Sequence, residues 1–100
     1  MPAYFIADVE WTDAEARAEY IRNFAPTLTP FGGEFIVSTP DPEPIEGDWR
    51  PKGTFVVLRF QTEEQARAWY ASDAYRPLLD LRLRSSHSNS LFVRGIEPRP

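Results

Sequence analysis

The sequence lacks cysteine and has a single histidine among its 100 residues. Without cysteine the chain has no disulfide, no thiolate nucleophile and no sulfur-ligated metal. One histidine and scattered carboxylates match neither a zinc site nor a histidine pair on a helix. A glycine-rich phosphate loop is missing as well, because Phe31-Gly32-Gly33 precedes an expected strand rather than a helix. We therefore predict a protein that holds no metal and no cofactor.

Long apolar runs and an excess of positive charge are also missing. No window approaches the roughly 20 consecutive apolar residues of a transmembrane helix, and the first residues lead into an acidic stretch instead of an export signal. Fifteen acidic against eleven basic residues give a net charge of −4, which disfavours contact with nucleic acid or anionic membranes. With 42% hydrophobic and 26% charged residues, the chain is typical of one globular domain over residues 1–100. We expect a cytoplasmic protein with no membrane and no nucleic-acid partner.

The first part of the chain has the pattern of a strand, a helix and a second strand. Residues 4–11 are aromatic, β-branched and alternating, which is typical of a strand. Thr12 and Glu15 have the spacing of a capping box, so a helix is expected from about residue 13. Pro26 predicts that this helix kinks or restarts, and Gly32-Gly33 predicts a turn into a strand. The apolar stripe of the helix comprises Ala14, Ala18, Ile21, Ala25 and Leu28, with Tyr20 and Phe24 alongside.

The second part repeats this order after an irregular, proline-rich stretch. Thr62 opens a second capping-box pattern, and Ser72 and Asp73 can cap a further helix with Pro77 in its first turns. The expected elements are a strand over 34–38, a loop over 39–52, a strand over 54–60, helical segments over about 62–70 and 73–83, a polar connector over 84–89 and a strand over 90–96.

This β-α-β-β-α-β order predicts an α+β protein of the ferredoxin-like type, with a four-stranded antiparallel sheet and both helical layers on one face. Side chains alternate along a strand, so one set faces the helices and the other faces away. The sets predicted to face the helices are Phe5, Ala7, Val9 and Trp11; Phe35 and Val37; Val56, Leu58 and Phe60; and Leu91 and Val93. The sets predicted to face away are Tyr4, Ile6, Asp8 and Glu10; Glu34, Ile36 and Ser38; Phe55, Val57 and Arg59; and Phe92, Arg94 and Ile96.

The face of the sheet without helices, here called the open face, is unusually apolar. Seven of its predicted residues are large and apolar, and each is worth roughly 1.5–3 kcal/mol when it is removed from water. An exposed patch of this kind marks an interface or a ligand site. Two copies that pack through their open faces cover both patches, and a closed two-fold arrangement is the commonest one. We predict a homodimer that joins two sheets into an α+β barrel.

Two charged residues interrupt the open face. We interpret the first and third strands as parallel neighbours, with Asp8 and Arg59 each about halfway along its strand. This placement predicts either a salt bridge or a polar pocket between the sheets. In a pocket, Asp8 is a candidate general base beside Arg59, which can grip an anion. As a salt bridge, the pair is purely structural.

Five segments spread over nearly the whole chain resemble one known family. They are Tyr4-Phe5-Ile6-Ala7, Phe31-Gly32-Gly33-Glu34-Phe35, Glu46-Gly47-Asp48-Trp49-Arg50-Pro51, Trp69-Tyr70-Ala71-Ser72-Asp73-Ala74-Tyr75 and Leu91-Phe92-Val93-Arg94-Gly95. In this order they resemble the DUF1330 family of the dimeric α+β barrel superfamily, which implies two ferredoxin-like subunits joined sheet to sheet. The family has no assigned function, so the resemblance implies no substrate. The chain has Asp73-Ala74 where the family usually has a proline.

Further candidate site residues come from their chemistry alone. His87 is the side chain best suited to exchange a proton near neutrality, either as a catalytic group at a cavity mouth or as an ordinary exposed loop residue. Tyr4, Phe55 and Phe92 can line a ligand site or simply pack. Trp49 on the long loop can close over a ligand or pack against its own domain.

Two functions follow from these observations. The first is a cofactor-free enzyme that performs proton transfer, isomerisation or oxygen chemistry on a small organic molecule, with His87, Asp8 and Arg59 as catalytic candidates. It rests on analogy with other dimeric α+β barrels. The second is a non-catalytic protein that binds a small ligand or acts as an accessory.

Overall fold

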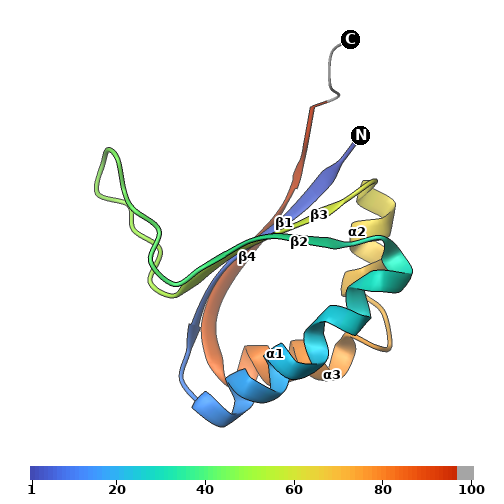
Figure 1. Cartoon of the computed structure of the whole chain (residues 1–100), viewed down its shortest axis with the longest axis horizontal. Helices are drawn as coiled ribbons and strands as arrows, with labels where there is room; N and C mark the ends of the chain where they lie inside the picture. Colours follow the sequence, from blue (N-terminus) through green and yellow to red (C-terminus); the bar gives the residue numbers. More distant parts are fainter. Residues whose placement is uncertain (97–100) are drawn as a thin grey trace.

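In the computed structural model, which describes residues 1–96, four strands form one sheet and the helices cover one of its faces (Figure 1). The strand order is β2-β3-β1-β4, and all neighbours are antiparallel, which confirms the predicted ferredoxin-like α+β fold. The strands are β1 (Ala3–Trp11), β2 (Glu34–Thr39), β3 (Thr54–Phe60) and β4 (Ser86–Arg94); the helices are α1 (Ala14–Leu28), α2 (Glu63–Tyr70) and α3 (Arg76–Arg84), with a short 3₁₀ turn η1 (Thr29–Phe31).

The predicted direction of the third strand is wrong. β1 and β3 are neighbours, but they are antiparallel, with Ala3 opposite Phe60 and Val9 opposite Thr54. The crossover through α1 returns the chain in the direction of β1, and β3 then turns back along β2. The two central strands therefore run in opposite directions.

Polar side chains mark the helix starts close to the predicted positions. Asp13, not Thr12, caps α1: its Oδ1 accepts from the backbone N–H groups of Glu15 at 2.9 Å and Ala16 at 3.2 Å. Thr62 caps α2 as predicted. The Asp13 carboxylate accepts from two N–H groups that have no partner within the helix. Asp13 is therefore the N-cap, and α1 begins one residue later than a Thr12 cap implies.

The start of α3 follows a turn rather than a side-chain cap. The Ser72 hydroxyl accepts from the backbone N–H of Tyr75 at 3.2 Å, and the helix begins at Arg76. Pro77 lies in the first turn, as predicted, where its missing N–H costs no helical hydrogen bond.

α1 turns a different face inward from the predicted stripe. It runs through Pro26 without a restart, because that residue lies in the last turn and removes one hydrogen bond there. The larger side chains, with Leu28 from the predicted stripe, take the inner face; the other stripe residues stay exposed, with Ile21 and Ala25 at the edge of a cavity between α1 and the sheet. Ala16, Phe24, Thr27 and Leu28 are buried, whereas Ala14, Ala18, Ile21 and Ala25 are exposed.

The core lies between the sheet and the helices and is rich in aromatic side chains. Trp69 of α2 is completely buried, and its indole N–H donates to Thr27 Oγ1 at 3.1 Å. The Trp69 ring lies 4.2 Å from that of Tyr75 and 5.3 Å edge-on from that of Phe5. Through these contacts Trp69 joins α2 to β1, to α1 and to the segment before α3.

The last strand shows the opposite face from the one predicted. Phe92 lies opposite Phe5, turned to the helices, and its ring is 5.5 Å from that of Phe5. Leu91 and Val93 lie on the open face, where Leu91 is 61% exposed. Both alternate sets of this strand are apolar, so alternation alone did not decide between them. Phe92 faces the helices because its ring also packs on Tyr70 of α2.

A bulge reverses the second half of β2. Glu34 and Phe35 keep their predicted faces, opposite Arg59 and Leu58, but the register shifts between Phe35 and Val37. Val37 then lies opposite Val57, on the open face. The next residue, Ser38, consequently turns toward the helices, contrary to prediction.

The predicted polar connector is also wrong, because β4 begins at Ser86. Residues 86–89 pair with the end of β1, with His87 opposite Glu10 and Ser88 opposite Val9. A stretch with polar residues on both faces has no apolar alternation to mark it as a strand. Its backbone pairing with β1 makes it one.

The chain between β2 and β3 extends well beyond the end of the sheet (Figure 1). Its return is held by Asp8, whose carboxylate accepts from the backbone N–H groups of Lys52 at 2.9 Å and Gly53 at 2.8 Å. Gly53 also lies so close to β1 that a Cβ atom would meet the carbonyl oxygen of Val9. Asp8 therefore anchors the end of this loop to β1.

Replacing Asp8 with alanine should destabilise the fold, because two N–H groups lose a charged acceptor. We expect Asp8→Ala to lower the free energy of unfolding by about 1–3 kcal/mol in urea titrations. Asp48→Ala, which removes an exposed carboxylate from the same loop, is the control and should change it by less than about 0.5 kcal/mol. Equal stability of the two variants would contradict the anchoring role.

Candidate functional site

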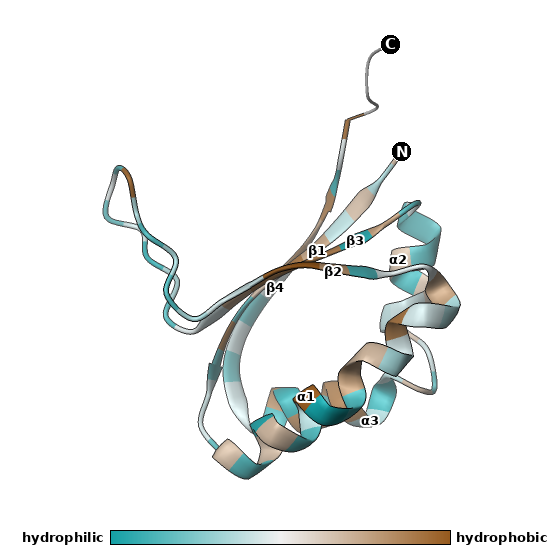
Figure 2. Ribbon diagram, viewed as in Figure 1, coloured by the Kyte–Doolittle hydropathy of each residue, from teal (hydrophilic) through white to brown (hydrophobic). Residues whose placement is uncertain are grey.

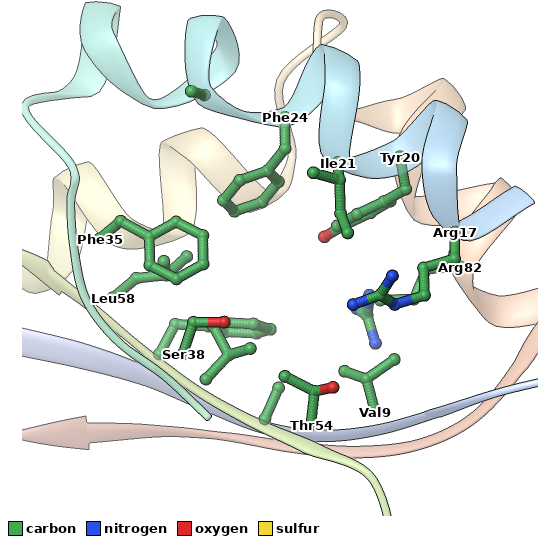
Figure 3. A pocket seen from close by; sticks show the side chains of 14 residues that line it. Val9, Arg17, Tyr20, Ile21, Phe24, Phe35, Ser38, Thr54, Leu58 and Arg82 are labelled. Carbon is green, nitrogen blue, oxygen red and sulfur yellow. The ribbon is translucent and has the colours of Figure 1, made fainter. Parts of the chain in front are cut away.

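A cavity of about 200 Å³ lies between the helix-facing side of the sheet and α1 (Figure 3). Its walls are mainly aliphatic and aromatic, and its polar groups come from a few residues. β1 supplies Phe5, Ala7 and Val9; α1 supplies Arg17, Tyr20, Ile21, Phe24 and Ala25; β2 supplies Phe35 and Ser38; β3 supplies Thr54, Val56 and Leu58; and α3 supplies Arg82.

The cavity opens between α1 and the edge strand β2. Ile21 and Phe35 line it from opposite sides and are 55% and 49% exposed, so solvent reaches the cavity past them. The bulge in β2 matters here, because it turns Ser38 rather than Val37 toward the cavity (Figure 3). The mouth is therefore apolar with one hydroxyl.

The opposite end of the cavity holds a buried cation. Arg82 is only 2% exposed, yet no Asp or Glu within residues 1–96 forms an ion pair with it. Its Nη1 donates to the Ser88 hydroxyl at 2.8 Å and its Nε to the Tyr75 hydroxyl at 3.4 Å. Its Nη2 is buried and has no hydrogen-bond partner among the described residues. A guanidinium without a counter-ion is costly to bury, so this end of the cavity favours negative charge.

Two tyrosines extend this network into the cavity. The hydroxyls of Tyr20 and Tyr75 lie 2.6 Å apart, and Figure 3 shows the Tyr20 hydroxyl directed into the space. Burial raises the pKa of Tyr20 well above its ordinary value, and the neighbouring Tyr75 raises it further, while Arg82 opposes both. Tyr20 therefore keeps its proton at neutral pH and acts as a hydrogen-bond donor, not as a base.

Arg82 keeps its charge in this setting. Burial works to lower the pKa of Arg82, but the contacts with Tyr75 and Tyr20 outweigh it and leave the pKa raised. The guanidinium also lies 5.9 Å from the centre of the Phe5 ring, a cation–π contact. The cation is thus held by hydroxyls and a ring face, none of which neutralises it.

The predicted catalytic residues lie away from this cavity. Asp8, Arg59 and His87 are all on the open face, as their strand register shows. The predicted contact between Asp8 and Arg59 is wrong: Asp8 lies opposite Phe55, four residues along β3 from Arg59, and Arg59 instead forms a 3.5 Å ion pair with Glu34. Their catalytic roles, and that of His87, stay predictions.

The predicted ligand-binding residues are divided between the two faces. Tyr4 and Phe55 lie on the open face, and the ring of Trp49 lies 6.3 Å from that of Phe55, near the base of the long loop. Phe92 lies on the helix side but packs on Phe5 rather than lining the cavity. None of these four side chains lines the cavity.

Sequence reasoning missed the residues that the cavity does collect. Arg82 follows Tyr75, Leu78 and Leu79 at helical spacings of seven, four and three, so it lies on the same face of α3 as these apolar residues. The sequence signal that could have identified Arg82 was the presence of an arginine on an otherwise apolar face of a helix. The pairing of Tyr20 with Tyr75 joins residues 55 positions apart and needs the packing of α1 against the segment before α3.

Neither a metal centre nor a membrane span is seen in residues 1–96. That region has no group of three or more His, Cys, Asp or Glu residues placed to hold a metal ion. None of its helices has the length and apolar character needed to cross a bilayer.

Similar structures are found among solved proteins. RPA0582, a protein of unknown function from Rhodopseudomonas palustris, is 17% identical with a TM-score of 0.73 over 97% of this chain and 84% of that one. SnoaB, a cofactor-independent oxygenase from Streptomyces nogalater, is 18% identical with a TM-score of 0.59 over 99% and 97%. A dimeric ferredoxin-like protein of unknown function from Thermobifida fusca is 17% identical with a TM-score of 0.65 over 93% and 90%. At such identities the likeness shows the fold alone.

Sequence comparison identifies the family. No curated protein matches the chain. The sequence profile described as "Domain of unknown function (DUF1330)" matches residues 2–96. This match spans nearly the whole chain and includes all five segments on which the resemblance was based. The chain therefore belongs to the DUF1330 family.

Proposed function

We propose that this protein is a cofactor-free enzyme that binds a small, mostly apolar organic molecule in the cavity between the sheet and α1. The observation that carries this proposal is the buried Arg82, which among residues 1–96 has no counter-ion and has one unpaired nitrogen at the end of an apolar space. A site of this kind can bind a molecule by its apolar body and stabilise negative charge that forms on one of its oxygens. SnoaB, with the same fold, is a cofactor-independent oxygenase, which makes such chemistry compatible with this scaffold.

The chemistry that suits these groups is the formation of an enolate. When a carbon next to a carbonyl loses a proton, its electron pair forms a C=C bond and the carbonyl pair moves to oxygen. The Tyr20 hydroxyl and the Arg82 guanidinium are placed to donate to that oxygen. If the substrate is conjugated, the enolate takes a proton at a carbon further along the chain, which is an isomerisation. With dioxygen as co-reactant, the electron pair of the enolate carbon instead forms a C–O bond, and the dioxygen is reduced to a peroxide. Proton transfer, isomerisation and oxygen chemistry share this first step.

One observation favours the alternative of a non-catalytic binding protein. The residues that line the cavity include no Asp, Glu, His or Lys, and Tyr20 keeps its proton. The departing proton must therefore go to water at the mouth of the cavity or to a basic group of the substrate itself. A bound molecule that exchanges no proton would identify the cavity as a binding site only.

Deuterium exchange tests the enzymatic proposal without knowledge of the substrate. We expect the protein to speed the exchange of α-hydrogens in acetophenone or indanone dissolved in D₂O, followed by proton NMR, with no effect of a metal chelator. Tyr20→Phe should slow this exchange by roughly 100-fold, because it removes a donor to the enolate oxygen. Tyr70→Phe removes a hydroxyl outside the cavity lining and should leave the rate unchanged.

The outcomes of this experiment separate the two functions. Exchange that depends on Tyr20 supports the enzyme. Chemical-shift changes at cavity residues without exchange support the non-catalytic alternative and contradict the enzyme for this substrate class. Exchange that is equal in Tyr20→Phe and the unaltered protein would contradict the role given to the cavity.

We also propose that the protein is a homodimer joined through its open faces. Large apolar side chains are exposed there: Ile36, Val37, Leu91 and Val93 are at least 37% exposed, with Tyr4, Ile6, Phe55 and Val57 half-buried beside them. Figure 2 shows the apolar stretch of β2 within this sheet. The Thermobifida fusca protein of the same fold is described as dimeric. A second copy is the cover that removes the whole patch from water.

The proposed dimer places the predicted polar residues inside the interface. Asp8, Arg59 and His87 lie on the open face, so they would be enclosed between the two sheets. Asp8 and Arg59 already have partners within one subunit, in the loop backbone and Glu34. Asp8 therefore enters the interface with its carboxylate hydrogen-bonded, and Arg59 enters it beside an acidic partner.

Light scattering on a sizing column tests the dimer at micromolar concentration. We expect a mass of about 23 kDa, twice that of the 11.5 kDa chain. Leu91→Asp places a charge on the open face and should shift the protein to monomer. Leu83→Asp makes the same change at a similarly exposed position on α3, 57% against 61%, and should leave the dimer intact. A monomeric parent protein, or dissociation of both variants alike, would contradict this interface.

A further inference from the structure

The charge balance of the cavity is opposite to that of the whole chain. The protein carries a net charge of −4, but its cavity lining includes two arginines, Arg17 and Arg82, and no acidic residue. Neither arginine forms an ion pair within residues 1–96. Figure 3 shows both guanidinium groups at the same end of the space. Arg17 is exposed, but Arg82 is buried. Buried charges in proteins are normally paired, so the lack of a counter-ion for Arg82 among residues 1–96 indicates that a ligand supplies it.

We propose that the substrate class of this cavity is a small phenol or enol, a hydroxyl on an unsaturated carbon, that binds as its oxyanion. The ionised oxygen lies against Arg82 and the Tyr20 hydroxyl, and the ring or unsaturated body fills the apolar part. This inference rests on the proposed function and specifies which molecules enter the site. No covalent step is involved: the ligand gives its hydroxyl proton to solvent when it binds.

The free donors of Arg82 gather at one end of its guanidinium. The Nε N–H donates to Tyr75 and one N–H of Nη1 to Ser88, while Nη2 has no partner among the described residues. The two N–H groups of Nη2 and the second N–H of Nη1 therefore remain for the anionic oxygen of a ligand. Arg17 adds positive charge at the same end (Figure 3).

The tyrosine pair supplies the second donor. When the Tyr75 oxygen accepts from Arg82, its own proton is free for Tyr20 at 2.6 Å, and the Tyr20 proton is then free for the ligand. Each bond in such a chain strengthens the next, and the chain begins on a cation. Because its pKa is raised, Tyr20 remains protonated and donates to the oxyanion instead of competing with it for a proton.

The remaining walls fit a flat body of limited size. Phe5, Phe24 and Phe35 present ring faces or edges, with Val56 and Leu58 from the sheet. An apolar cavity of about 150 Å³ in another protein binds benzene, so the 200 Å³ here accepts a substituted ring. Phe35, which is 49% exposed, lies at the end of the cavity away from the arginines, so the uncharged part of a longer molecule can extend past it (Figure 3).

The test uses 4-nitrophenol, whose phenolate is yellow and whose neutral form is not. At a pH equal to the pKa of the free phenol, addition of protein should increase the yellow absorbance, because a site that prefers the anion lowers the pKa of the bound phenol. The neutral ether 4-nitroanisole has nearly the same shape and should bind roughly 10- to 100-fold more weakly than 4-nitrophenolate. Binding of both probes is measured by calorimetry and by chemical shifts of the cavity residues.

Variants assign the effect to the cavity. Arg82→Met, which keeps an unbranched stem and removes the charged group, should abolish the absorbance increase and weaken 4-nitrophenolate binding roughly 10- to 100-fold. Tyr20→Phe should weaken it less. Arg22→Met makes the same change as Arg82→Met at an exposed position on α1 and should have no effect. Should Arg82→Met not fold, the absorbance change of the unaltered protein and the Tyr20→Phe comparison still decide.

Each outcome has a definite meaning. Tighter binding of 4-nitrophenolate with a lowered phenol pKa supports the inference. Equal binding of 4-nitroanisole, or a raised phenol pKa, overturns the preference for an oxyanion but leaves the cavity as a site for small apolar molecules. If neither probe binds, both the inference and the proposed function fail for ligands of this size.

Discussion

The arrangement on the helix side depends on the burial of one guanidinium without a carboxylate. Arg82 links α3 to β4 through Ser88 and, through Tyr75 and Tyr20, to α1. A carboxylate partner would have neutralised the charge of Arg82 within the protein. Hydroxyls hold the cation in place but leave its charge uncompensated, so the same group that joins three elements also gives the cavity a positive end. Arg82 therefore contributes both to the packing of the fold and to the candidate site.

The sheet imposes a second constraint, because large apolar side chains lie on both of its faces. On β1, Phe5, Ala7 and Val9 meet the helices, while Tyr4 and Ile6 between them face the other way. Helices cover the first set, and no element among residues 1–96 covers the second. The homodimer proposed above would cover it with the same face of a second copy. Asp8 fits this face because its carboxylate is already satisfied by the loop backbone.

Most of the fold could be predicted from the sequence, because local signals agree with the global order. Thr62 and the apolar alternation of residues 54–60 defined α2 and β3 correctly. The failures occur where local pattern carries no information: the polar residues 86–89 become a strand by pairing with β1, and the bulge in β2 exchanges the faces of Val37 and Ser38. The candidate site was missed for the same reason. Chemistry pointed to His87, Asp8 and Arg59, but only packing brings Arg82, Tyr75 and Tyr20 together, and a single sequence does not contain that distance information.

The same strands carry the side chains of both faces of the sheet, so the proposed dimer interface and the cavity are connected through β1 and β3. Leu58 and Val56 form part of the cavity floor, and the residue between them on β3, Val57, lies on the open face opposite Ile6. A second sheet packed against Val57 and Ile6 would restrict the twist and bending of β1 and β3, and so the position of the cavity floor. The buried cation needs a donor geometry held to within a few tenths of an ångström to stabilise an oxyanion. In the proposed dimer, pairing of the open faces would therefore stiffen the strands that form the cavity floor, although the interface and the cavity lie on opposite faces of the sheet.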